Sequence, residues 1–124
     1  MTKLLGLACL MSVMFAVEAS AACSAQRVPT SRNQTVDTRM RVTSGDACGY
    51  RLRDSLSPVH TIAIAQRPSN GAATVDVNRV RYRSRPGFVG NDTFTYAMHG
   101  HSALSGSPAV WRVRVHVTVV PKSR

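Results

Sequence analysis

The chain has 124 residues, with 16 Lys or Arg against 6 Asp or Glu, and its formal net charge is +10. This length fits a single domain with a small hydrophobic core. Glu18 is the single Glu, and the other five acids are Asp residues scattered along the rest of the chain. No Gly-x-Ser-x-Gly nucleophile motif accompanies the Ser and His residues. These features argue against a paired-carboxylate or serine-hydrolase site, and we do not expect an enzyme.

The first 21 residues are expected to be a signal peptide. Lys3 supplies the positive end, an apolar run covers residues 4–17, and Ala19-Ser20-Ala21 fits the small-x-small cleavage rule. The apolar run is short for a permanent membrane span, so we expect a mature chain from Ala22 with no transmembrane segment. Two alternatives remain open, an uncleaved membrane anchor and lipidation at Cys23.

Cysteine usage predicts a disulfide in the mature chain. Cleavage would remove Cys9 and leave Cys23 and Cys48. An even number of cysteines in a small exported domain is typical of a disulfide-bonded protein. Such a bridge would close a loop of about 25 residues, worth on the order of 3 kcal/mol in the chain-entropy model. The expected location is therefore periplasmic or secreted.

The expected mature chain begins with a polar segment, which is followed by a segment in which apolar and polar residues alternate. Residues 22–34 include Pro29 and are expected to form an N-terminal arm or an irregular first edge. Residues 35–43 alternate with period 2 and predict a strand with Arg39 and Arg41 on its polar face. Residues 50–53 and 60–65 predict two shorter strands.

Residues 66–96 carry the clearest turn and strand signals. Pro68-Ser69-Asn70-Gly71 is a dense turn cluster. Residues 73–77 and 79–85 alternate as two strands, with Asn78-Arg79 as the predicted hairpin connection. Pro86-Gly87 breaks the second strand. Gly90-Asn91-Asp92 is a predicted turn, and Phe94 and Tyr96 then face inward from the next strand.

Two motifs in this stretch carry a resemblance to a known family. They are Gln66-x-Pro68-x-x-Gly71 and Tyr82-x-x-x-Pro86-Gly87-Phe88-x-Gly90-x-Asp92-x-Phe94-x-Tyr96. This pattern resembles the bacterial immunoglobulin-like (cadherin-like) domains that are repeated in large surface proteins. The resemblance implies a β-sandwich used as a stalk, spacer or adhesion module, and it implies no enzymatic activity. The chain departs from the family in having Ser84 where Pro is frequent, a single copy, and few clustered acids.

The end of the chain completes the expected fold. Residues 98–108, rich in Gly, Ser and His, are a predicted loop. Residues 111–120 alternate Val with polar residues and predict the last strand, which Pro121 ends. We therefore expect an all-β protein, a single immunoglobulin-like β-sandwich of about seven strands over residues 35–121.

The arginines are the candidate binding residues. Two of the sixteen basic residues are Lys3 and Lys122, so fourteen are Arg. Guanidinium groups bind phosphate, sulfate or carboxylate bidentately, and alternate strand residues lie about 6.6 Å apart on one face. A row of this kind suits the binding of a repeating polyanion. The alternative is that the arginines only keep the outer face of the sheet hydrated and discourage pairing with another strand. The candidate residues are Arg79, Arg81, Arg83, Arg85, Arg112 and Arg114.

Other chemistry is weakly supported. His99-x-His101 is a candidate pair of metal ligands, with His60 or His116 as a distant third ligand. No Cys or carboxylate lies nearby in sequence to complete a site, so we expect no metal and no cofactor. Nucleic acid is a disfavoured partner because the few aromatic residues face inward.

The sequence therefore predicts a non-catalytic exported binding module at the bacterial cell envelope. Its expected partner is an anionic polysaccharide or lipopolysaccharide, with contact to a membrane surface left open. The alternatives are a structural envelope or secreted subunit packed on a protein partner, and a small secreted enzyme inhibitor that inserts a loop such as residues 99–107.

Overall fold

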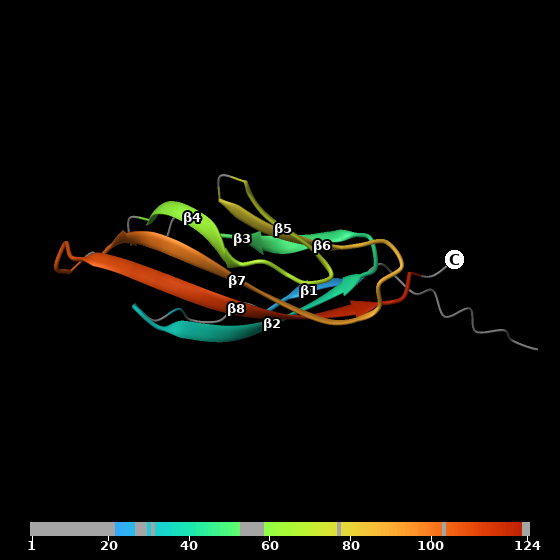
Figure 1. Ribbon diagram of the computed structural model, residues 1–124. Coiled ribbons are helices and arrows are strands. Elements are labelled where there is room, and N and C mark those ends of the chain that lie inside the picture. The colour runs from blue at the N-terminus through green and yellow to red at the C-terminus, as the bar shows by residue number, and fades with distance from the viewer. Residues whose placement is uncertain are drawn as a thin grey trace, which may run out of the picture.

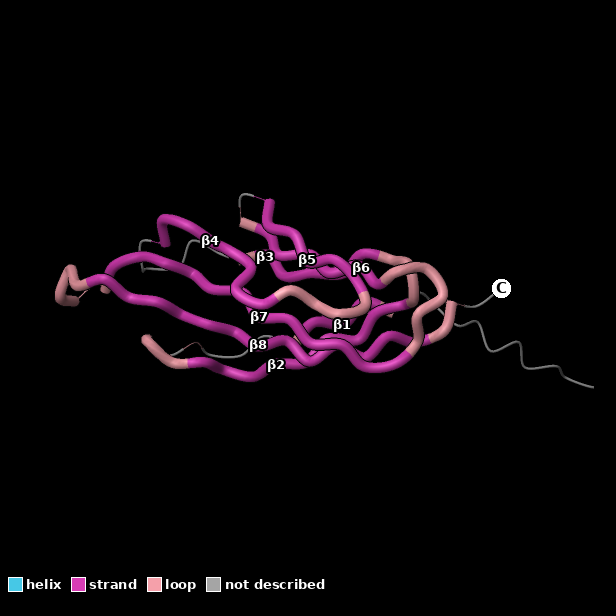
Figure 2. The backbone as a smooth tube through the Cα atoms, viewed as in Figure 1, coloured by secondary structure: helices cyan, strands magenta, loops and turns pink. Residues whose placement is uncertain are grey.

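The computed structural model describes residues 22–26, 30, 32–52, 59–76, 78–102 and 104–122. The predicted signal peptide, residues 1–21, lies outside the described residues. Within the described part every regular element is a strand and none is a helix (Figure 2), which confirms the all-β class. The strands are β1 (Cys23–Ala25), β2 (Thr35–Thr43), β3 (Ala47–Arg51), β4 (Val59–Gln66), β5 (Gly71–Asp76), β6 (Arg79–Ser84), β7 (Gly90–His101) and β8 (Pro108–Val120).

These strands form two sheets that stack face to face (Figure 1). One sheet has five strands in the order β1-β2-β8-β7-β4, and the other has three in the order β3-β6-β5. The long hairpin of β7 and β8 is the centre of the larger sheet, and β2 pairs with β8 in parallel. The strand β4, at the edge of the larger sheet, contacts β5 at the edge of the smaller one. The architecture is a two-sheet β-sandwich.

Alternation along each strand places the apolar residues between the sheets. In β8 the residues Val113, Val115, Val117 and Val119 are all buried, while the residues between them are exposed. Aromatic pairs join the two sheets: the rings of Tyr82 and Phe94 are stacked with centroids 5.7 Å apart, and those of Tyr50 and Tyr96 are 6.1 Å apart. Such pairs contribute about 0.5–1.5 kcal/mol beyond the area they bury.

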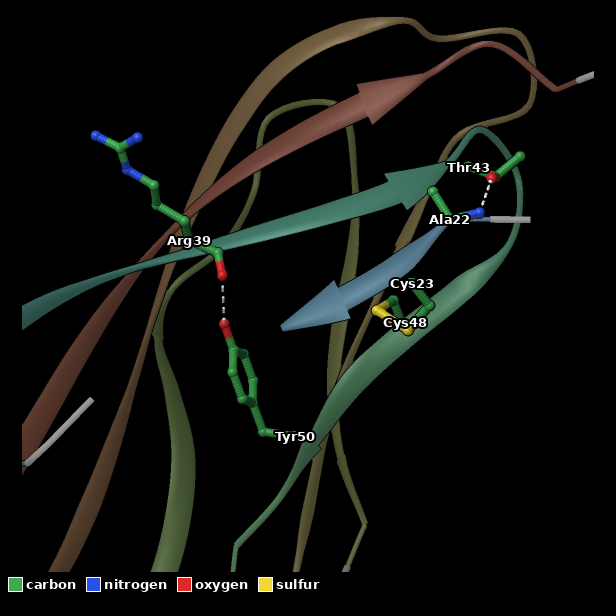
Figure 3. Close-up of a disulfide and its surroundings, with 6 residues drawn as sticks. All are labelled: Ala22, Cys23, Arg39, Thr43, Cys48 and Tyr50. Atoms are coloured by element: carbon green, nitrogen blue, oxygen red, sulfur yellow. Dashed lines mark hydrogen bonds between the residues drawn. A yellow bond between two sulfur atoms is a disulfide. The ribbon is translucent and has the colours of Figure 1, made fainter. Parts of the chain in front are cut away.

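A disulfide joins the two sheets at one edge (Figure 3). It connects Cys23 in β1 of the larger sheet with Cys48 in β3 of the smaller one, and their Cα atoms are 5.4 Å apart. Near it, the Tyr50 hydroxyl donates to the Arg39 carbonyl at 3.2 Å, and the Ala22 amide donates to Thr43 Oγ1 at 2.7 Å. The predicted Cys23–Cys48 bridge is confirmed.

Several predicted boundaries differ from the structure. The strand β1 lies within the predicted arm and pairs with β2, so this segment contributes an edge strand to the larger sheet. Arg79 begins β6 and pairs with Asp76, so Arg79 belongs to the strand and not to the predicted connection at 78–79.

The predicted loop at residues 98–108 is the largest error. There, β7 continues to His101 because Met98 pairs with Trp111 and Gly100 pairs with Ala109, and the inward-facing members of this run are buried. The strand β7 ends at His101 and β8 begins at Pro108.

Candidate anion-binding face

The arginine row lies along the middle of the smaller sheet. Arg79, Arg81 and Arg83 are exposed, while Val80, Tyr82 and Ser84 between them are buried. Because β6 is flanked by β3 and β5, the row is carried by the central strand and its backbone is fixed by hydrogen bonding on both sides. The row is therefore a rigid line of guanidinium groups with a repeat of about 6.6 Å along the strand.

The residues facing the row from the neighbouring strands are mostly small. Arg83 lies between Ala47 and Ala72, and Arg81 lies between Gly49 and Thr74. Small neighbours leave the guanidinium groups standing above the sheet, accessible from both sides. Two hollows result, one of about 260 Å³ beside Arg79 and Arg81, and one of about 370 Å³ beside Arg83 and Arg85.

At one end of the row the cross-strand neighbours are charged. Arg79 lies directly opposite Arg51 of β3 on one side and Asp76 of β5 on the other. Arg51 is a member of this face that sequence reasoning missed, because only the register of β3 against β6 places it beside Arg79.

Asp76 faces Arg79 from β5 but forms no ion pair with it. Among the described residues, both ion pairs involve Asp37, which lies on the other sheet. No described carboxylate is within ion-pair distance of Arg79, Arg81 or Arg83. A positive face without paired acids attracts anions more strongly than one of mixed charge.

Arg85 stands at the end of the row, just beyond β6. Its guanidinium lies 5.7 Å from the centre of the Phe88 ring, and its backbone amide donates to the Asn70 carbonyl at 2.9 Å. Arg85 is exposed and extends the row, but it is held by different contacts from the three strand arginines.

Arg112 and Arg114 do not belong to the same face. They lie on β8 in the larger sheet, whose outer side also carries Arg39 and Arg41 of β2. The six candidate arginines therefore divide into two patches on opposite sides of the sandwich.

The patch on the larger sheet is partly neutralised. Arg114 Nη1 lies 3.5 Å from Asp37 Oδ1, and His116 Nε2 lies 2.9 Å from the same oxygen. The hydrogen bond from His116 is the main cause that lowers the pKa of the Asp37 carboxyl below its usual value, and the charge of Arg114 adds to it. This salt-bridged cluster makes the larger sheet the weaker candidate for anion binding.

Asp92, a residue of the motif, has a structural role. The interpretation of Asn91 and Asp92 as turn formers is wrong, since β7 begins at Gly90. The buried Asp92 carboxylate accepts hydrogen bonds from the Ser69 and Asn70 amides, each at 3.0 Å, and from the Tyr82 hydroxyl at 2.9 Å. Burial is the main cause that raises the pKa of the Tyr82 hydroxyl, and the Asp92 carboxylate adds to it, so this hydroxyl stays a neutral donor.

The histidines show no metal-binding arrangement in the part of the chain that the structure describes. His99 and His101 are exposed at the far end of β7. Across the described residues, no three His, Cys, Asp or Glu side chains gather so that they could hold a metal ion.

Comparisons with protein-family models, with curated proteins and with solved structures give no match for this chain. Among the described residues there is no helix with the length and apolar character of a membrane span. What the fold and the site define is a two-sheet β-sandwich, closed by an inter-sheet disulfide, with a line of arginines on its smaller sheet.

Proposed function

We propose that this protein is a non-catalytic exported binding module whose smaller sheet holds an anionic component of the bacterial cell envelope. The observation that carries the proposal is the row of Arg79, Arg81 and Arg83, exposed on a central strand and without a carboxylate partner among the described residues. We also propose that the domain is an immunoglobulin-like sandwich of the bacterial surface-protein type, on the strength of the motif around Tyr82 and Asp92.

The disulfide supports an extracytoplasmic location. Disulfides form and persist in oxidising compartments, and Cys48 is buried beside the core. The proposal is that cleavage after Ala21 releases a periplasmic or secreted chain that begins at Ala22.

The chemistry of the face suits a repeating polyanion. Guanidinium groups bind phosphate, sulfate and carboxylate with paired hydrogen bonds, and a fixed repeat along a strand favours a ligand with several such groups. Acidic polysaccharide and the phosphates of lipopolysaccharide both fit this description. Nucleic acid fits poorly, because the tyrosines of the described part of the smaller sheet, Tyr50 and Tyr82, face the core and are buried.

Retention on a sulfated polysaccharide column in a salt gradient tests the proposal. We would compare the chain from residue 22 onward with the variant Arg79→Ser/Arg81→Ser/Arg83→Ser. The matched control is Arg39→Ser/Arg41→Ser/Arg112→Ser, which removes the same charge from exposed strand positions of the larger sheet. The row variant should elute at distinctly lower salt than the control. Equal elution of the two variants would show that retention follows net charge and would contradict the proposal.

A second candidate function, docking on a protein partner, is favoured by Leu104. This side chain is 97% exposed at the tip of the β7–β8 hairpin. The turn is braced, since the Ser102 amide donates to the Ser107 carbonyl at 2.8 Å and the Ser102 hydroxyl accepts from Arg32 Nη1 at 2.8 Å. A rigid tip with an exposed Leu suits insertion into an apolar pocket of a partner or a target enzyme. On the present proposal, the neutral change Leu104→Ser should leave polysaccharide retention unchanged.

A further inference from the structure

The hollow beside Gly49 is the most specific feature of the arginine face. It is lined by Arg51, Arg79 and Arg81 together with Gly49, Tyr50 and Val80. Its volume of about 260 Å³ is below the range of about 300–1,000 Å³ that is typical of pockets for drug-sized ligands. The space suits a single compact group.

Three guanidinium groups border this hollow from two strands. Arg51 on β3 and Arg79 on β6 are directly opposite, and Arg81 is the next outward residue of β6, opposite Gly49. Directly opposed residues have Cβ atoms about 4.5–5.5 Å apart, and the diagonal neighbours remain within reach of long side chains. All three arginines can therefore contact one small anion at the same time.

Gly49 keeps the floor of the hollow open. A Cβ atom at this position would overlap the Val80 carbonyl oxygen, so glycine allows β3 to lie close against β6. Where another residue would place a side chain between Arg51 and Arg81, the sheet presents only backbone.

Arg51 and Arg79 repel each other in the protein without a ligand. Like charges that are directly opposite across an antiparallel pair destabilise it, and Arg51 and Arg79 are such a pair. Asp76, the acid nearest in register, lies opposite Arg79 on the far side of β6 and forms no ion pair with it. An anion in the hollow would relieve the repulsion.

From these observations we propose that Arg51, Arg79 and Arg81 form a subsite for one phosphate monoester. This inference rests on the proposed function of the same face and names the group that the face recognises. At neutral pH a phosphate monoester carries close to two negative charges and three acceptor oxygens, which match three guanidinium donors better than a singly charged carboxylate does. The second hollow, beside Arg83 and Arg85, has two arginines and would hold a neighbouring anionic group less selectively.

Titration with inorganic phosphate tests the subsite. The arginine Nε–H signals of the chain from residue 22 onward would be followed by NMR at constant ionic strength, with acetate as a second titrant. The signals of Arg51, Arg79 and Arg81 should saturate with one common dissociation constant for phosphate and not for acetate. Arg51→Ser should raise that constant roughly fivefold, the scale of one exposed charge-assisted contact. Arg41→Ser, an equal change of charge on the other sheet, should leave it unchanged.

Stability provides a second readout. Arg51→Ser should unfold at the same temperature as the unchanged protein or at a higher one, because it removes the opposed charges while it weakens binding. The source of the phosphate is separated by two further probes, glucose 1-phosphate in solution and phosphatidylcholine vesicles with and without phosphatidic acid. If one of these probes binds, and if Arg51→Ser weakens that binding while Arg41→Ser does not, the subsite is supported. The probe that binds then identifies the source of the phosphate.

The inference is wrong if all arginine signals, those of Arg39 and Arg41 included, move linearly and together, or if Arg51→Ser and Arg41→Ser bind phosphate equally. Its failure differs from failure of the proposed function. If the arginine signals do not saturate with phosphate but the row variant still elutes early from the polysaccharide column, only the phosphate subsite is refuted. If the arginine signals saturate with phosphate while the row variant and its control elute at the same salt concentration, the subsite is supported and the polysaccharide function is refuted.

Discussion

Replacement of Asp92 by Ala should be among the most damaging single changes in this domain. The Asp92 carboxylate accepts hydrogen bonds from the Ser69 amide (3.0 Å), the Asn70 amide (3.0 Å), the Thr93 amide (2.9 Å) and the Tyr82 hydroxyl (2.9 Å). It thus ties the turn before β5 to β6 and to the start of β7, and the motif residues Tyr82 and Asp92 act as one unit.

The size of the effect follows from these contacts. Hydrogen bonds to a charged group contribute about 1.5–3 kcal/mol each, and they are not additive when one acceptor serves several donors. Water can replace part of the loss at the turn amides but not at the buried Tyr82 hydroxyl. We expect Asp92→Ala to lower the free energy of unfolding by about 3–5 kcal/mol, a large part of the ~5–15 kcal/mol of a typical domain. Tyr82→Phe removes one of the four bonds and should lower it by about 1–2 kcal/mol.

Urea unfolding of the oxidised chain measures these changes. Asp76→Asn is the control, since Asp76 is an exposed strand acid without an ion pair among the described residues, and its effect should be within about 0.5 kcal/mol. The transition slope should stay constant, so that a shift of midpoint reports stability. If Asp92→Ala lies within about 1 kcal/mol of the unchanged protein, the carboxylate does not organise this corner and the physical account of the motif is wrong.

Three further predictions concern the disulfide, a close strand contact and a surface carboxylate. Reduction of Cys23–Cys48 should lower the free energy of unfolding by about 3 kcal/mol, since the bridge closes 25 residues; equal urea midpoints with and without reductant would contradict this. Gly71→Ala should cost about 2 kcal/mol, because the added Cβ would overlap the Arg83 carbonyl oxygen; the same urea assay would refute it by an unchanged midpoint. The pKa of Asp37 is lowered chiefly by His116, so this carboxylate contributes stability above its unfolded pKa of about 3.8 that is lost as pH falls through the folded value. An NMR titration of His116→Val, which removes the donor, should show the pKa of Asp37 moving up toward 3.8, and no movement would remove His116 as the cause.

Local alternation was sufficient to predict most strands and their inward faces. The valines of β8 and the pair Val80 and Tyr82 of β6 are buried as expected, because a period-2 pattern with one apolar face has a single register that keeps that face dry. Pro86-Gly87 follows the end of β6, also as expected.

The grouping of the arginines could not be obtained in the same way. A row within one strand follows from sequence spacing, and the outward row of Arg79, Arg81 and Arg83 was predicted correctly. Membership of a sheet depends on pairing between distant segments, such as the parallel pairing of β2 with β8. For this reason the sequence could neither separate Arg112 and Arg114 from the row nor place Arg51 beside Arg79.

Two misassignments have a compositional cause. Gly90-Asn91-Asp92 has the residues of a turn, yet Asp92 is held in β7 by its long-range hydrogen bonds. Residues 98–101 contain Gly and His and were assigned to a loop, but the strand continues there because Met98 packs into the core opposite Trp111. In both places tertiary contacts outweigh local preference.

The salt dependence of polyanion affinity tests the central claim most directly. The dissociation constant of a fluorescently labelled sulfated oligosaccharide would be measured across a range of salt concentrations for the unchanged chain, for Arg79→Ser/Arg81→Ser/Arg83→Ser, and for Arg39→Ser/Arg41→Ser/Arg112→Ser. In nucleic acids each neutralised phosphate adds about 0.7–0.9 to the slope of log affinity against log salt, and we expect the same scale for a densely sulfated chain. The row variant should therefore lose about two to three units of slope, while the control keeps nearly the full value. Equal slopes for the two variants, or a larger loss in the control, would show that the smaller sheet is not the binding face.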